Sequence, residues 1–204
     1  TLTWWEVVHR GAEQAGKDFN YEIIWVGPDL ETDRARQIQA VEDVITRQAQ
    51  AVVLGPNDSK ALARTVEAVK EAGLPCVIID SPVDTDVYDA FVATDNYAGG
   101  AEAARLLGAA LSGRGKVAVI KFVQNSASTD ARAQGFTETM AKEFPNIQVA
   151  AEQYTQGSVE DARQKTEDLL ARLGAIDGLF AVNQPTAIGA YKAIENQKLL
   201  GKIK

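Results

Sequence analysis

The chain has 204 residues, a formal net charge of −7 at pH 7 and a single cysteine. Hydrophobic residues make up 46% and charged residues 24%, which excludes a disordered chain and allows one large or two smaller globular domains. The lone cysteine excludes an internal disulfide framework, no apolar run is long enough to span a membrane, and the acidic balance argues against a nucleic-acid partner.

The first residues lack an initiator Met and the basic start and apolar core of a secretion signal, so we expect a processed or trimmed chain. Trp4 and Trp5 open a helical pattern that continues through Val7, Val8 and Ala12. Adjacent helix positions point about 100° apart, so both tryptophans cannot enter the core. We expect one to pack inside and the other to be free to stack on a ligand ring, although packing of both is an equal alternative.

Seven short, largely apolar runs predict strands at residues 21–26, 51–54, 76–80, 91–94, 116–122, 147–154 and 178–182. Apolar residues at helical spacing predict helices at 31–48, 58–72, from about 130, at 159–173 and from 185. The strands are apolar rather than alternating, as expected of strands buried on both faces. The βαβα alternation predicts parallel sheets with helices on both faces, either as one open sheet or as two sheets that divide near residues 94–96.

Ligands of open α/β sheets bind beyond the carboxyl ends of the strands. Loops rich in short hydrogen-bonding side chains follow five of the predicted strands, at residues 55–59, 80–81, 95–97, 124–130 and 183–185. Such side chains suit a small polyhydroxylated molecule, whose hydroxyls both donate and accept. Asp58, Asp95, Ser158 and Asn183 each lie where helix N-caps belong. For any one of them capping is the favoured interpretation, and for the set it is a ligand site.

Several catalytic and cofactor signatures are absent from the sequence. It contains no phosphate-binding glycine motif after a strand, and its one histidine, His9, has no neighbouring metal ligand. Cys76 lies inside a predicted strand and reads as a buried, inert thiol. Asp80 directly ends that strand, whereas the acidic residues of segment 84–89 read as a solvated loop. We therefore expect no catalytic residue, no cofactor and no metal.

Four stretches in order resemble the periplasmic sugar-binding proteins of ABC transporters, of the ribose/galactose type: LGPNDSKALARTVEAVKEAGLPCVIIDSPVD, FVATDNYAGGAEAARLL, NSASTDARAQGF and LFAVNQPTAIGAYKAI. The resemblance implies the α/β type I periplasmic binding protein fold, with two similar Rossmann-like lobes at residues 1–94 and 95–204. It implies a hinge between the lobes and a sugar in the cleft. It also implies a chain that lacks the family's first strand and its C-terminal elements.

Carried over by position, the family's aromatic pair falls on Trp4 and Trp5, its strand-end acid on Asp80 and its second-lobe arginine on Arg132. The ligand-binding residues that the resemblance implies are Trp4, Trp5, Asn57, Asp80, Thr94, Asn96, Arg132, Asn183 and Gln184. Ribose-binding members differ at three positions, where this chain has Gly55, Ser81 and Asp130. The ligand is therefore left open between ribose, another monosaccharide and a polyol.

The resemblance implies a solute-binding protein that presents a monosaccharide or polyol to the membrane permease of an ABC transporter. We expect a monomer, in the periplasm or anchored outside the cell as a lipoprotein. One alternative is the sugar-sensing effector domain of a LacI-type transcription regulator, which shares the architecture. A second alternative is an α/β enzyme that acts on a sugar through Asp80 and Arg132.

Overall fold

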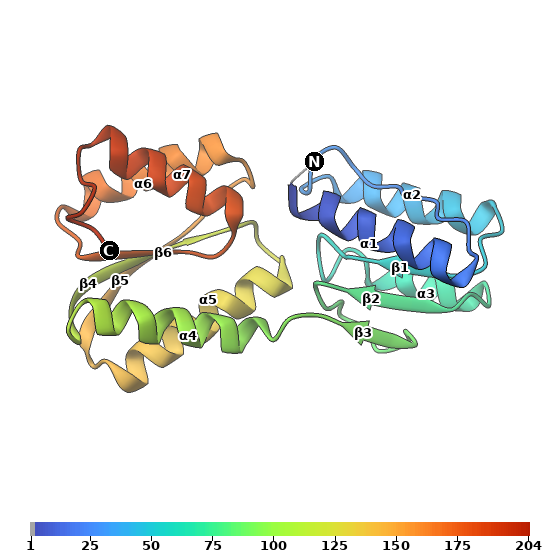
Figure 1. Cartoon of the computed structure of the whole chain (residues 1–204), viewed down its shortest axis with the longest axis horizontal. Coiled ribbons are helices and arrows are strands. Elements are labelled where there is room, and N and C mark those ends of the chain that lie inside the picture. The colour runs from blue at the N-terminus through green and yellow to red at the C-terminus, as the bar shows by residue number, and fades with distance from the viewer. Residues whose placement is uncertain (1–2) are drawn as a thin grey trace.

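The computed structural model describes residues 3–204 and contains two three-stranded parallel sheets flanked by helices (Figure 1). The elements in chain order are α1 (Thr3–Phe19), α2 (Arg34–Thr46), β1 (Val52–Leu54), α3 (Ala63–Glu71), β2 (Cys76–Ile79), β3 (Ala90–Val92), α4 (Asn96–Ala110), β4 (Arg114–Lys121), α5 (Ala127–Glu143), β5 (Asn146–Tyr154), α6 (Val159–Leu173), β6 (Gly178–Ala181) and α7 (Gln184–Asn196). The predicted α/β class with parallel sheets is confirmed. We call the part through β3 the first lobe and the part from α4 the second lobe. The boundary between residues 94 and 95 stays a prediction.

The first lobe has the strand order β1-β2-β3 and one buried sheet face. Apolar residues of α2 and α3, including Val41, Val66 and Val69, pack on that face and cover Leu54 and Ile78. Cys76 is also buried there, which confirms the predicted burial of its side chain.

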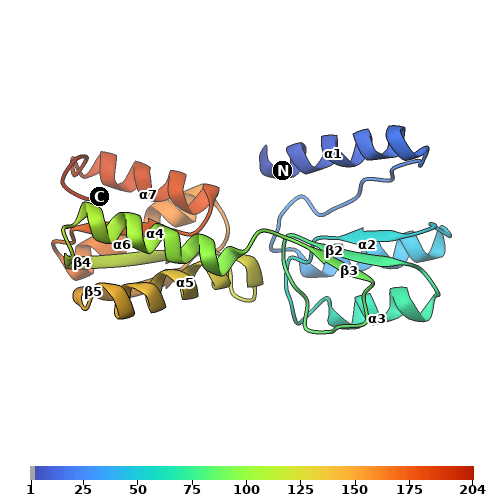
Figure 2. The same ribbon diagram turned by 60° about the horizontal axis from the view of Figure 1, so that its bottom comes forward.

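The opposite face of the first sheet is open, which makes the prediction of burial on both faces wrong for these strands. Val53 is 64% exposed and Val92 is 63% exposed. Figure 2 shows the reason, because α1 is held away from this sheet and segment 20–33 runs between them.

The predicted strand at 21–26 is also wrong. These residues form no regular secondary structure, and the apolar side chains among them, such as Ile24 and Trp25, are exposed. A strand requires a hydrogen-bonded neighbour as well as β-branched residues, and within residues 3–204 this segment pairs with no strand. Trp25 instead stacks on His9 of α1, with ring centroids 4.4 Å apart.

The second lobe has the strand order β5-β4-β6 and is buried on both faces, as predicted. Val117 and Val119 of the central strand face Phe136 and Met140 of α5, while Ile120 faces the α6 side. All five side chains are fully buried. In Figure 1 the helix pairs α4–α5 and α6–α7 accordingly lie on opposite sides of this sheet. Among the residues that the structure describes, no helix has the length and apolar character needed to cross a membrane.

Candidate ligand-binding site

The carboxyl ends of the two sheets meet where the lobes touch. The Ser59 backbone N–H, just after β1, donates to the Asn125 carbonyl at 3.1 Å, and the Asn125 side chain donates to Asp58 Oδ2 at 3.1 Å. Beside them the Ser81 hydroxyl, just after β2, donates to the Ser128 hydroxyl at 2.7 Å. The loops after β1, β2 and β4 therefore form one junction.

Asp80 follows β2 at this junction and has an unusual backbone. Its φ of 64° lies in the left-handed region, which few residues other than glycine, Asn and Asp adopt. Burial raises the pKa of its carboxyl group, while the positive charge of Arg132 and a hydrogen bond from Ser81 act in the opposite direction. Asp80 thus combines a strained backbone with a carboxylate that is poorly solvated, and such features gather at functional sites.

Arg132, on α5 of the second lobe, is held from two sides. Its Nε donates to Asn96 Oδ1 at 2.8 Å and its Nη1 donates to the Val182 carbonyl at 3.0 Å. A Cβ on Gly100 would lie only 1.9 Å from the Arg132 carbonyl oxygen, so glycine is required for α4 to approach α5 this closely. Nη2 makes no hydrogen bond to any group in residues 3–204, which leaves it available to a ligand.

The two N-terminal tryptophans differ in their exposure, and neither belongs to a core cluster. Trp4 is 47% exposed, and its ring meets that of Trp5 edge-on at 4.6 Å between centroids. Trp5 is half-buried, and its Nε1 donates to Glu31 Oε1. The expectation that one tryptophan enters the core is wrong, because α1 is held away from the sheet and Trp5 contacts it at Gly55, just after β1, without joining a core cluster.

The remaining predicted residues differ in burial and in hydrogen bonding. Both polar atoms of the Asn57 side chain are buried and lack a hydrogen-bond partner among residues 3–204. Asn96 is 7% exposed and joins the Thr94 carbonyl to Arg132, while Thr94 itself is exposed. Asn183 caps α7 through Thr186. Gln184 is exposed at the first position of α7.

The structure therefore joins Asn96 to Arg132 by a hydrogen bond, lets the charge of Arg132 act on Asp80, and places Trp4 beside Trp5. Asn183 is linked to this group only through its neighbour Val182, which accepts from Arg132. Within the described part of the chain, Gln184 has no hydrogen bond to the other predicted site residues.

Sequence reasoning overlooked two parts of this junction. The first is Glu31, whose carboxylate interacts with Trp5 and lies close enough to Asp80 for the two charges to repel. The second lies at the ends of β4 and β5, where the Tyr154 hydroxyl donates to Asp130 at 2.8 Å and Lys121 lies 4.4 Å from the Tyr154 ring centroid. Tyr154 was detectable, because it lies at the end of a predicted strand, whereas Glu31 follows no real strand and its contact with Trp5 carries no sequence signal.

Comparison with known proteins agrees with this arrangement. A family model described as "Periplasmic binding protein domain" matches residues 1–204. The ribose import binding protein of Bacillus subtilis is 30% identical over 187 residues, which cover 92% of this chain and 60% of that protein. The D-ribose/D-allose-binding protein of Pseudomonas aeruginosa is 30% identical, over 90% of this chain and 59% of that protein. The chain thus spans roughly three fifths of the length of these curated relatives.

Solved structures give the same result. An ABC transporter solute-binding protein from Agrobacterium vitis with bound D-fucose is 35% identical, has a TM-score of 0.94 and matches 100% of this chain and 71% of its own. A carbohydrate transporter solute-binding protein from Agrobacterium radiobacter in complex with D-arabinose is 31% identical, has a TM-score of 0.95 and matches 99% of this chain and 70% of its own. With its fold, its facing strand ends and a family match along its whole length, the chain belongs to the periplasmic binding proteins.

Proposed function

We propose that this protein is the substrate-binding component of an ABC transporter and that it captures a monosaccharide or polyol between its two lobes. The observation that carries the proposal is the junction of the lobes, where Asn125 bonds Asp58 and Ser81 bonds Ser128, and where the positive charge of Arg132 acts on Asp80. Asp80 accepts from ligand hydroxyls, and Arg132 donates to ligand oxygens through Nη2. The names of the relatives concern sugar import and binding, which favours transport over the regulatory and enzymatic alternatives.

The proposed mechanism is closure of the lobes around the ligand. A ligand that contacts Asp80 and Arg132 together gains more binding energy when the lobes are close, so it shifts the population toward the closed state. The hydrogen bonds from Asn125 to Asp58 and from Ser81 to Ser128 join the lobes directly and stabilise the same state. No covalent step is part of this function.

The remaining site residues have defined roles in the proposal. Trp4 and Trp5 provide aromatic surface for the apolar face of a sugar ring. Asn57 has an amide free to bond a ligand or a water molecule, and Asn96 orients Arg132. Thr94 contributes from the end of the first lobe, and Asn183 and Gln184 complete the second-lobe side of the site. The proposed partner is a membrane permease, and the protein is proposed to act as a monomer. The proposed location is the periplasm or, as an anchored lipoprotein, the outer surface of the cell.

A thermal-shift screen tests the proposal. The protein, expressed with its natural termini, is melted with pentoses, hexoses, 6-deoxyhexoses, inositols and linear polyols. A ligand at 100 times its dissociation constant adds about 2.7 kcal/mol to stability, which raises the melting temperature of a chain of this size by about 5–10 °C. NMR of the recovered sugar is expected to show it unchanged. No shift with any compound contradicts sugar binding, and a converted sugar contradicts the binding-protein role in favour of an enzyme.

A further inference from the structure

The Trp5 indole is fixed at both of its ends. At the polar end, Nε1 donates to Glu31 Oε1 at 2.5 Å. At the opposite end, the six-membered ring lies against Gly55, where a Cβ would come within 2.6 Å of Trp5 Cη2 and 3.3 Å of Cζ3. Any side chain at position 55 therefore displaces the ring. The ring orientation depends on one acceptor and on one position that has no side chain.

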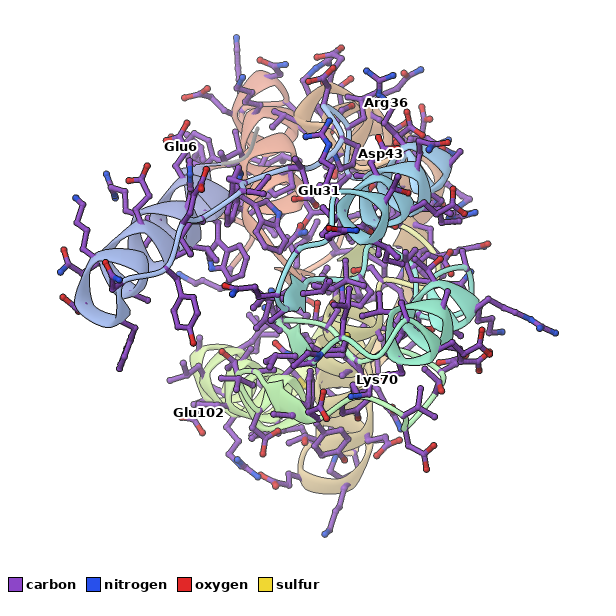
Figure 3. All side chains as sticks on the ribbon, turned by 90° about the vertical axis from the view of Figure 1, so that its right-hand side faces the viewer. Glu6, Glu31, Arg36, Asp43, Lys70 and Glu102 are labelled. Atoms are coloured by element: carbon purple, nitrogen blue, oxygen red, sulfur yellow. The ribbon has the colours of Figure 1, made fainter. Side chains whose placement is uncertain are left out.

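Glu31 has no other hydrogen-bond partner in residues 3–204 and no cation within salt-bridge distance there. Figure 3 labels it between α1, which carries Glu6, and α2, which carries Arg36 and Asp43. Burial raises the pKa of its carboxyl group, and the nearby charge of Asp80 raises it further, while the Trp5 hydrogen bond lowers it. A half-buried carboxylate whose one hydrogen bond within residues 3–204 goes to Trp5 loses part of its hydration, and we explain its presence by its effect on the Trp5 ring.

We propose that Glu31 and Gly55 are positioning residues that hold the Trp5 indole in one orientation at the junction of the lobes, an inference that rests on the proposed sugar-binding function. Glu31 fixes the rotation of the indole by accepting from its N–H. Gly55 lets the ring lie against the backbone at the end of β1. A ring held in this way is an aromatic surface prepared for the ligand before it arrives, and such preorganisation raises affinity because no ordering cost remains to be met on binding.

The test uses the variants Glu31→Leu, Glu31→Gln and Gly55→Ala, with Glu22→Gln as a control that removes an exposed negative charge from the same segment. Protein labelled with 5-fluorotryptophan gives a ¹⁹F NMR resonance for each of the three tryptophans, and Trp5→Phe assigns that of Trp5. In the ligand-free protein, Glu31→Leu and Gly55→Ala are expected to move the Trp5 resonance toward that of an exposed indole. Glu31→Gln keeps an acceptor oxygen and is expected to restore the resonance, and Glu22→Gln is expected to leave it unchanged.

Calorimetry with the sugar that gives the largest thermal shift provides the second readout. Glu31→Leu and Gly55→Ala are each expected to weaken sugar binding about tenfold. The first variant removes a hydrogen bond to a charged group, and the second displaces the ring that this hydrogen bond holds in position. In a Trp5→Phe background, which has no indole N–H, Glu31→Leu is expected to cost nothing further.

The outcomes separate this inference from the proposed function. An unmoved Trp5 resonance in both Glu31→Leu and Gly55→Ala overturns the positioning role, and so does a full additional loss of affinity from Glu31→Leu in the Trp5→Phe background. If no sugar binds the parent protein, the proposed function fails, but the ligand-free NMR experiment still decides whether Glu31 and Gly55 hold Trp5. If Glu31→Leu fails to fold, Gly55→Ala decides the question, and an unmoved Trp5 resonance in that variant overturns the positioning role.

Discussion

The two sheets of this protein arise from the same alternation of strand and helix, yet they are buried differently. In the second lobe the adjacent residues Val119 and Ile120 of β4 point to opposite faces, and both are fully buried. In the first lobe the adjacent residues Val53 and Leu54 of β1 are 64% and 5% exposed. The difference lies in the helices, because both faces of β4 are covered and only one face of β1 is.

This difference extends to the candidate site. Arg132 of the second lobe is anchored by a close α4–α5 contact at Gly100 and by the hydrogen bonds that it donates to Asn96 and to the Val182 carbonyl. In the first lobe, Asp80 depends on a left-handed turn, and Trp5 depends on Glu31 and Gly55. The second lobe thus presents a preformed half of the site, while the first presents side chains whose positions rest on a few local contacts.

The largest effect that we expect comes from the core of the second lobe. Phe136 is fully buried and stacks on Phe180 with ring centroids 4.4 Å apart. Phe136→Ala removes this ring from a tightly packed core, so we expect the free energy of unfolding to fall by about 3–5 kcal/mol. Urea unfolding followed by circular dichroism measures the loss.

A matched pair of valines serves as the control for that comparison. Val119→Ala is expected to cost about 2 kcal/mol, whereas Val53→Ala is expected to stay within about 0.5 kcal/mol because its side chain is already in solvent. An equal loss at the two positions contradicts the difference between the lobes.

The second effect concerns ligand affinity and the rigid half of the site. Arg132→Lys keeps the positive charge, but a single ammonium nitrogen cannot bond Asn96, Val182 and a ligand in the geometry of a guanidinium. We expect it to weaken sugar binding at least tenfold and Arg132→Ala to weaken it about 100-fold, as measured by calorimetry. Arg105→Lys, at an exposed ion pair with Glu143 on the same pair of helices, is the control. If Arg132→Lys binds the sugar as tightly as the parent protein, the guanidinium geometry does not contribute to binding.

The second lobe was predictable from the sequence because its burial is local to each strand. Eight-residue β4 is apolar on both faces, and that pattern alone predicts a central strand. The short strand β1 has equally apolar letters, Val52, Val53 and Leu54, but its second face depends on where α1 lies. The prediction of a strand at the apolar segment 21–26 was wrong for a related reason. Hydrophobic periodicity in a segment does not show whether a neighbouring strand is available to pair with it.

The site was predictable where it follows the ends of strands and unpredictable where it depends on contacts between distant segments. The positions after β2 and β4 led to Asp80 and toward Arg132, and their mutual charge interaction agrees with that interpretation. The Trp5–Glu31 hydrogen bond joins residues 26 positions apart and has no motif. The role of Gly55 is equally hidden in the sequence, because a glycine after a strand is usually interpreted as part of a turn. Only the structure shows that the Trp5 ring occupies the space where a side chain at position 55 would lie.

The smallest effect tests whether the first lobe's site acid is kept at a cost to stability. Because burial raises the pKa of Asp80 above its ordinary value of 3.8, the folded protein holds this proton more tightly than the unfolded chain. The contribution of Asp80 to the free energy of unfolding therefore falls as pH rises from 3.8 through the raised pKa, and above it the full cost of an ionised, buried carboxylate is present. Asp80→Asn removes that cost, and asparagine also tolerates the left-handed backbone, so the change isolates the charge.

We expect Asp80→Asn to unfold at a higher temperature than the parent at pH 7, with a difference that shrinks toward pH 3, while its affinity for the sugar falls. Melting curves between pH 3 and pH 8 measure the difference, and Asp86→Asn, in the exposed loop after β2, corrects for the change in net charge. A less stable Asp80→Asn at pH 7 means that the carboxylate is stabilised by its surroundings, in which case the first lobe holds its acid as firmly as the second holds Arg132. A more stable variant that has lost affinity means instead that the carboxylate contributes to ligand binding although it lowers the stability of the fold.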